Sequence, residues 1–291
     1  MDGETINNNV VTIYKLILFV LGITGNLLFI HLIYKKRRLR TRSSLLQCAQ
    51  CAFHIVCLFG TVLGGFMMDP STRTRQNCFV HISFYIFCQA AQVLIMLIIM
   101  ADILVSVKFA IFYHNLSTWK YTLSVSIPVL IYSSFVVFYG YLTTNEEPIQ
   151  ACNPLFAFSF PASLLHKCQI LFLCFVTTAI YIILIKMFHK MERSQNDDSL
   201  KIMKRLQFSV IIFIFTWLVS QVVAIIFLRD GAMVKTERMI FAHNSVFIAL
   251  SYSNTFYVTM WKSEEYRKQF LNVWRSKKTV PTQRPNTLPS V

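Results

Sequence analysis

Polar side chains recur at helical spacing along one otherwise apolar stretch of this 291-residue chain. His81, Tyr85, Gln89 and Gln92 follow one another at steps of four, four and three residues. That spacing places them on one stripe of an α-helix. Imidazole, phenol and amide groups donate and accept hydrogen bonds. The stripe therefore predicts hydrogen bonding, either to a bound molecule or, with equal weight, to a neighbouring helix.

Few other polar side chains interrupt the apolar stretches, where each is costly unless it finds a partner. They are Asn26, His54, Asp102, Gln221, Asn244, Ser251 and Asn254. The sequence has no His-Glu-x-x-His, Gly-x-Ser-x-Gly or phosphate-binding glycine loop, the patterns of common hydrolases and nucleotide-binding proteins. A single carboxylate, Asp102, cannot divide acid and base roles between two groups. We expect no enzyme, no metal site and no cofactor.

Asp102 is the physically unusual residue among these. It falls at the carboxyl end of its apolar stretch, where the partial negative charge of a helix end repels a carboxylate. Arg42 and Lys108 lie in adjoining basic segments, and a buried pair with either could act as a latch between two conformations. The alternative is an Asp102 exposed to solvent at the membrane interface.

The elements that must position these residues are seven apolar runs, each long enough to cross a bilayer as a helix. We predict spans at Val10 to Tyr34, Leu45 to Met68, Phe79 to Val105, Tyr121 to Leu142, Gln169 to Phe188, Leu206 to Leu228 and Ile240 to Met260. Hydrophobic residues make up 55% of the chain and charged residues 14%, which excludes an ordinary soluble protein of this length. The fold class is therefore an all-α membrane protein, a seven-transmembrane helix bundle. Internal repeats and paired broken helices, which transporters show, are missing from the pattern.

The net charge of +15 is concentrated in alternate loops. The densest cluster of Lys and Arg lies at residues 35–42, after the first run. Cytoplasmic loops carry such an excess, so the N-terminus is predicted outside and the C-terminus in the cytoplasm. The cluster is first a topology signal, with binding of membrane lipid or a partner as the alternative. No nucleic acid partner is expected, and residues 1–9 form no removable signal peptide.

Three cysteines lie at or near the predicted outer face, where the environment is oxidising. Cys78 begins the third run, and Cys152 lies midway along the loop after the fourth. A disulfide between them would tether that loop over the end of the helices. Cys168 is the rival partner for this bridge.

The separation of Cys78 and Asp102 puts these residues at opposite ends of the third span. Together with Gly25-Asn26 in the first span and with Phe213 and Trp217 in the sixth, this pattern resembles rhodopsin-like G-protein-coupled receptors. The closest similarity is to nematode serpentine chemoreceptors of class SX, through Leu45 to Gly60, Met100 to Lys108 with Tyr113, and Trp261 to Arg267. It covers nearly the whole chain. The resemblance implies a plasma-membrane chemosensory receptor that signals through a heterotrimeric G protein.

The family binds its ligands in the outer half of the helix bundle. By this resemblance the ligand-binding residues are His81, Tyr85, Gln89, Gln92, Trp217, Gln221, His243 and Asn244. Tyr85 stands where amine receptors of the family have a carboxylate, so a cationic amine would be buried without a counter-charge. A small neutral or weakly polar odorant is expected, with a peptide contacting residues 143–167 as the alternative.

Several family positions hold different residues here. Asp102 opens the family's Asp-Arg-Tyr triplet, but Ile103 replaces the arginine, which leaves Asp102, Ile103 and Tyr113 as the predicted coupling residues. Replacing Ile103 by arginine is predicted to strengthen coupling. His54 stands where the family has an aspartate that binds sodium, and imidazole is a poor ligand for that hard cation. Asn26, His54, Phe213, Asn254 and Tyr257 are the predicted structural positions.

The hinges of the family are also altered. Val219 replaces the proline of the sixth helix, and Asn254 to Tyr257 is a degraded form of the seventh-helix Asn-Pro-x-x-Tyr. Helices without these prolines are expected to lose their kinks. A non-coupling or decoy receptor, or a ligand-gated channel or carrier subunit, is therefore kept as an alternative function.

After the seventh run, Tyr266, Phe270, Val273 and Trp274 share one helical face opposite Arg267 and Lys268. They predict an amphipathic eighth helix on the inner leaflet. The predicted organisation is a short extracellular N-terminus at 1–9, the helical domain at 10–276 and a disordered cytoplasmic tail at 277–291.

Overall fold

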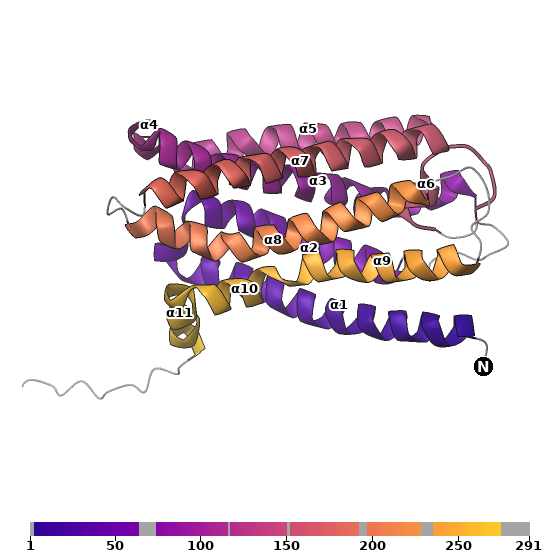
Figure 1. Ribbon diagram of the computed structural model, residues 1–291, viewed down its shortest axis with the longest axis horizontal. Coiled ribbons are helices and arrows are strands. Elements are labelled where there is room, and N and C mark those ends of the chain that lie inside the picture. Colours follow the sequence, from indigo (N-terminus) through magenta and orange to yellow (C-terminus); the bar gives the residue numbers. More distant parts are fainter. Residues whose placement is uncertain are drawn as a thin grey trace, which may run out of the picture.

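The computed structural model describes residues 3–63, 74–115, 117–149, 152–191, 197–227 and 235–274. The long helices run side by side (Figure 1). They form seven rods, which are α1 (Gly3–Lys35), α2 (Arg42–Leu63), α3 (Arg75–Lys108), α5 (Thr118–Leu142), α7 (Phe160–Met191), α8 (Asp197–Ile226), and a last rod made of α9 (Lys235–Ser253) and α10 (Thr255–Lys262). Shorter elements connect or follow them: η1 (Arg37–Leu39), α4 (Ala110–Asn115), α6 (Pro154–Ala157) and α11 (Glu264–Trp274). The predicted all-α seven-helix bundle is confirmed.

The two ends of the bundle carry different short elements. The chain's N-terminus and α6 lie at one end, and α4 and α11 lie at the other (Figure 1). We call these the α6 end and the α11 end. The first, third, fifth and seventh rods start at the α6 end, as an up-and-down bundle requires.

The helices have the length and composition of membrane spans. Over the described residues α1, α2, α3, α5 and α7 are long and apolar enough to cross a bilayer, and α8 adds the shorter apolar segment Val210–Ile226. Large apolar side chains such as Ile131, Phe138 and Phe172 point out of the bundle and are exposed. In water such a surface would cause aggregation, but in a bilayer these apolar side chains face apolar lipid tails. The protein is a multi-pass membrane protein.

The central helix is α3. It packs against α2, α5 and α7, and 56% of its most apolar window is buried inside the protein, compared with 22% for α5. Its buried side chains belong to one large core that α7, α8 and α9 complete. The polar stripe is therefore carried by the most buried of these five apolar helices.

All seven rods begin earlier than the apolar runs predict, and the difference is largest in α1, α7 and α8. α1 starts at Gly3 instead of Val10, α7 at Phe160 instead of Gln169, and α8 at Asp197 instead of Leu206. In α7 the added turns contain Ser163, His166 and Lys167, which lower the apolarity of the sequence but are buried. The predicted span ends at Met68 and Leu228 and the predicted tail at 277–291 lie outside the described residues.

The last rod breaks at Asn254 although no proline is present there. The Asn254 side-chain amide donates a hydrogen bond to the Ser251 carbonyl over 2.8 Å. An asparagine that bonds the preceding turn in this way competes with the backbone ladder. The last rod is thus interrupted here without a proline, whereas α8 runs unbroken from Asp197 to Ile226.

The amphipathic helix after the bundle is confirmed as α11. Tyr266 is buried, stacks on Phe29 of α1 at 6.2 Å between ring centroids and shares a 2.6 Å hydrogen bond with the Ser44 hydroxyl of α2. Phe270 packs edge-on against Phe256 of α10. The apolar face of α11 is thus partly covered by the bundle itself. Trp274 stays exposed at the end of the helix.

Candidate ligand-binding and coupling sites

A buried polar cluster occupies the middle of the bundle. Gln89 and Gln92 of α3 and Gln221 of α8 are all buried. Both amide atoms of Gln92 and of Gln221 have no hydrogen-bond partner among the described residues. Buried amides are normally satisfied, because an unmade hydrogen bond costs about 1–3 kcal/mol. Such groups are available to a bound molecule.

Trp217 joins this cluster to the last rod. Its indole is fully buried, donates to the Ser251 hydroxyl over 3.1 Å and lies 5.8 Å from the Phe213 ring. The Tyr252 ring lies 6.3 Å away on the other side. Tyr252 in turn stands beside Tyr85 and Gln89 of α3. Side chains from α3, α8 and α9 therefore form one connected group.

Asn244 completes the group on α9. It is buried, its amide donates to the Ser220 carbonyl over 3.2 Å, and its carbonyl oxygen has no partner within the part of the chain that is described. The sequence predicted Tyr85, Gln89, Gln92, Trp217, Gln221 and Asn244 as ligand-binding residues, and the structure buries all six.

The other two predicted ligand-binding residues lie elsewhere. His81 is exposed and its ring is hydrogen-bonded to the Asn77 carbonyl of its own helix. His243 is also exposed, and its Nε2 lies 2.8 Å from the Asn7 amide oxygen of α1. Neither ring joins the buried group. One residue along an α-helix turns a side chain by about 100°, which separates His243 from the adjacent Asn244.

The loop between α5 and α7 is fastened across the α6 end. A disulfide joins Cys78 at the start of α3 to Cys152, with 5.4 Å between their Cα atoms, while Cys168 is a free, exposed thiol. Arg75 donates to Asn145 over 2.9 Å and pairs with Glu147 at 2.8 Å. The loop therefore has both a covalent and an ionic attachment to α3.

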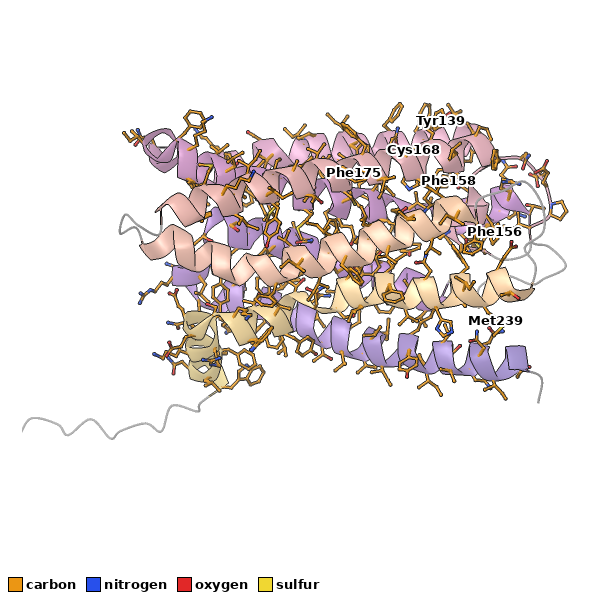
Figure 2. All side chains as sticks on the ribbon, viewed as in Figure 1. Tyr139, Phe156, Phe158, Cys168, Phe175 and Met239 are labelled. Carbon is orange, nitrogen blue, oxygen red and sulfur yellow. A yellow bond between two sulfur atoms is a disulfide. The ribbon has the colours of Figure 1, made fainter. Side chains whose placement is uncertain are left out.

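Aromatic side chains of this loop point into the bundle (Figure 2). The Phe158 ring lies 5.3 Å from Phe79 and 5.0 Å from His166, and Phe156 lies 6.5 Å from Phe241 of α9. A side chain at Gly140 would collide with Phe79 and Phe158, so this glycine makes room for their contact. Phe156 and Phe158 therefore cover part of the α6 end.

Sequence reasoning missed two buried residues near this closure. His166 and Lys167 were assigned to the loop, but both lie in the second turn of α7 and are buried. Both ring nitrogens of His166 lack a partner among the described residues. A strict hydropathy threshold starts the fifth helix too late. Extending that span toward its N-terminus would have included both residues.

A small cavity lies between the cluster and the α11 end. Its volume is about 10 Å³, close to the least that holds one water molecule. It is lined by Gln47, Gln50, His54, Met96, Ile99, Phe213, Ser251, Asn254 and Thr255. No carboxylate is among these described lining residues, so a cation there would find neutral ligands only.

The predicted structural residues surround this cavity. His54 lies 5.5 Å from the Tyr252 ring, and the Asn26 amide donates to the Tyr252 carbonyl over 3.0 Å. Tyr257 is partly exposed and donates to the Leu21 carbonyl over 2.9 Å. These bonds tie α1, α2 and the last rod together near its break at Asn254.

A second cavity of about 600 Å³ opens between α3 and α5. Its lining is Phe79, Val80, Ser83, Phe84, Phe87, Ser134, Val137, Phe138 and Tyr141. Several of these side chains, including Phe84 and Phe138, are exposed on the lipid-facing surface. This apolar groove is separate from the polar cluster.

Asp102 is buried at the α11 end of α3, with 2% of its surface exposed. Its Oδ2 accepts a 3.1 Å hydrogen bond from the Tyr113 hydroxyl of α4, and Tyr121 of α5 lies on the same carboxylate. Arg42 of α2 lies over the Tyr113 ring at 4.1 Å and donates to the Tyr113 carbonyl over 2.5 Å. The cluster joins four helices.

The burial of Asp102 contradicts the expectation that this residue is exposed to solvent. Arg42 acts on the carboxylate electrostatically, whereas Lys108 is exposed and lies over Phe109. Burial and the nearby Asp102 charge raise the pKa of Tyr113, so its hydroxyl keeps the proton that it donates.

Ile103 follows Asp102 in α3 but is apolar and makes no polar contact of this kind. It is 3% exposed and belongs to the large hydrophobic core. The position where the family has its arginine is therefore packed among apolar side chains in this state.

A comparison with protein-family models gives one match, which covers residues 19–274. Its description is serpentine type 7TM GPCR chemoreceptor Srsx. No curated protein matches the chain. The matched range contains the second half of α1 and the six other rods, and it ends with α11. The chain belongs to the serpentine Srsx family of seven-transmembrane G-protein-coupled chemoreceptors.

Proposed function

We propose that the protein is a plasma-membrane receptor that binds a small molecule in the half of the bundle next to the α6 end. The observation that carries this proposal is the group of buried amides on Gln92 and Gln221 without partners among the described residues. Aromatic neighbours such as Trp217 add the apolar contact area that ligand pockets use. Phe156 and Phe158 cover part of the α6 end, which favours a small molecule over a peptide.

Residue charge supports the orientation. The basic segment at 35–42 lies in η1 and the start of α2, so the α11 end faces the cytoplasm and the α6 end faces outward. An epitope tag at the N-terminus should stain intact cells. Staining that requires permeabilised cells would contradict this topology.

Binding is proposed to shift the balance between resting and active states. The active state would open the α11 end to a heterotrimeric G protein. Trp217 and Tyr252 offer the connection, because they contact both the amide group and the residues around the small cavity. Cells that express the full chain with a calcium or cyclic-nucleotide reporter test the proposal, and the variant Trp217→Leu should lose the response while reaching the surface.

A second candidate is a receptor that binds its ligand without coupling. Burial of Ile103 favours it, since the charged group that engages the G protein in this family is replaced by a core side chain. The two candidates separate when binding and signalling are measured together. Ligand-dependent stabilisation of the purified protein without any second-messenger response would favour the non-coupling receptor.

A further inference from the structure

Lys167 lies inside the bundle near the α6 end. α7 begins at Phe160, so Lys167 is about 10 Å along the helix from that end. Its side chain is 5% exposed. A lysine so close to a helix end ordinarily extends its ammonium group to water. Here the protein covers almost the whole residue.

The face of α7 that carries Lys167 points into the protein. Ser163, Ile170 and Cys174 lie four residues before it and three and seven residues after it, and all are fully buried. Phe172, on the opposite side of the helix, is exposed, and so is Leu164, three residues before the lysine. The lysine therefore lies at the edge of the inward stripe of the helix.

Lys167 has no ion-pair or hydrogen-bond partner among the described residues. The acidic groups at this end serve other positions. Glu147 pairs with Arg75 at 2.8 Å, Glu146 is exposed, and Glu237 lies in the first turn of α9 with an interaction of its own. No described carboxylate neutralises the lysine.

Other buried donors lie at comparable distances from the ends of their helices. Gln221 is about 8 Å from the end of α8 and Asn244 about 14 Å from the start of α9, compared with about 10 Å for Lys167 in α7. His166 adds a buried imidazole whose nitrogens are unpartnered among the described residues and whose ring stacks on Phe158. This part of the bundle therefore contains several buried N–H donors and a lysine.

A buried ammonium without a counter-ion is costly, and an anionic ligand would remove that cost. A cationic ligand would add like-charge repulsion. We propose that the ligand is a small organic anion whose carboxylate, or a comparable acidic group, binds Lys167. This rests on the proposed small-molecule receptor function and replaces the expectation of a neutral ligand.

The test uses the full-length chain, purified in lipid nanodiscs, and a panel of short aliphatic and aromatic carboxylic acids with the methyl ester and the primary amide of each acid. We expect acids to raise the melting temperature and their esters and amides not to. In Lys167→Met, apparent affinity for an active acid should fall at least about 30-fold. Lys167→Arg should keep most of it. Lys186→Met, which removes an exposed lysine from the other half of α7, is the matched control and should bind as the unaltered chain does.

The melting temperature of the ligand-free protein separates a binding role of Lys167 from a structural one. Lys167→Met should raise the melting temperature of the empty protein, because it removes an uncompensated buried charge and keeps the side-chain length. A lower melting temperature in this variant would show that the lysine stabilises the fold, and would overturn the proposal.

The remaining outcomes separate the proposed anion site from the proposed receptor function. Esters or amides that stabilise the protein and signal in cells would leave small-molecule reception standing and overturn the anion. Acids that stabilise through Lys167 without a second-messenger response would support the anion site and contradict G-protein signalling. A panel with no stabilising compound would contradict both.

Discussion

The two ends of the bundle treat buried polar groups differently. At the α11 end Asp102, Tyr113 and Arg42 contact one another across separate helices, and only the Asp102 Oδ1 atom of these three side chains lacks a hydrogen-bond partner among the described residues. Toward the α6 end both amide atoms of Gln221 lack such partners, and no described residue pairs with Lys167. A connected network holds one arrangement of helices, whereas unsatisfied donors carry a penalty that a ligand can relieve. The difference separates the part that sets the resting state from the part that senses.

The largest effect is expected at the α11 end, where a substitution would bury a new charge without a partner. Ile103→Arg restores the family residue, and the sequence pattern alone predicts stronger coupling. Burial of Ile103 in the core predicts instead a loss of about 3–5 kcal/mol of unfolding free energy from the uncompensated charge. Surface expression and the melting temperature of the purified variant measure it.

Ile103→Leu is the matched control and should change both quantities little, because it conserves volume and polarity. An Ile103→Arg protein that reaches the surface at normal levels and signals more strongly would show that the position opens in the active state, and would contradict its structural role.

The next effect concerns the cation of the network. Arg42→Met keeps the length of the side chain but removes the contact with the Tyr113 ring and the bond to its carbonyl. We expect a loss of about 2–3 kcal/mol and a higher ligand-independent signal, because α4 is released from α2. Thermal melts and basal reporter activity measure the two consequences.

Arg38→Met is the control for a basic residue at the same end. Arg38 pairs with Glu265 at 3.4 Å, but its side chain is 81% exposed, and such surface pairs contribute about 0–1 kcal/mol. Equal effects of the two variants would mean that the Arg42 contacts do not hold the resting state.

The bundle was predictable from the sequence because lipid imposes a simple rule on length and polarity. The rule fails where burial is against protein instead of lipid. Ser163, His166 and Lys167 lowered the apolarity of the fifth run, so its helix was placed too late. The break at Asn254 was missed because it depends on a side-chain bond and not on proline.

The candidate site was predictable only in part, for a related reason. Helical spacing gave the stripe of Tyr85, Gln89 and Gln92 on α3, since the period is a property of one helix. Whether a residue near a helix end faces the bundle depends on the rotation of that helix against its neighbours. His243 therefore turned out to contact Asn7 of α1, and the partners of Asp102 required three other helices.

A subtler change removes one hydrogen bond and keeps the ring. In Tyr113→Phe the hydroxyl bond to Asp102 is lost, while the aromatic face under Arg42 stays. The expected cost is about 1–2 kcal/mol, smaller than for Arg42→Met, and it should appear in the melting temperature of the purified protein. Tyr14→Phe, on the exposed lipid-facing surface of α1, should leave the melting temperature unchanged. A loss as large as that of Arg42→Met would mean that the hydroxyl, and not the cation, carries the network.

The smallest effect is a gain in stability, and it tests the unpaired amide of Gln221 directly. Gln221→Leu exchanges an amide that has no partner among the described residues for an apolar side chain of similar size. Deleting an unsatisfied group removes its desolvation penalty, so the empty protein should gain up to about 1 kcal/mol. The response to ligand should weaken, because a donor of the proposed ligand site is gone. Gln50→Leu is the matched variant, since Gln50 lines the small cavity and its amide lies 4.0 Å from the Met96 sulfur. It should give no comparable gain, because the cavity can supply its amide with a water molecule. If Gln221→Leu instead lowered the melting temperature, its amide would have a structural partner, and the contrast between the two ends would be lost.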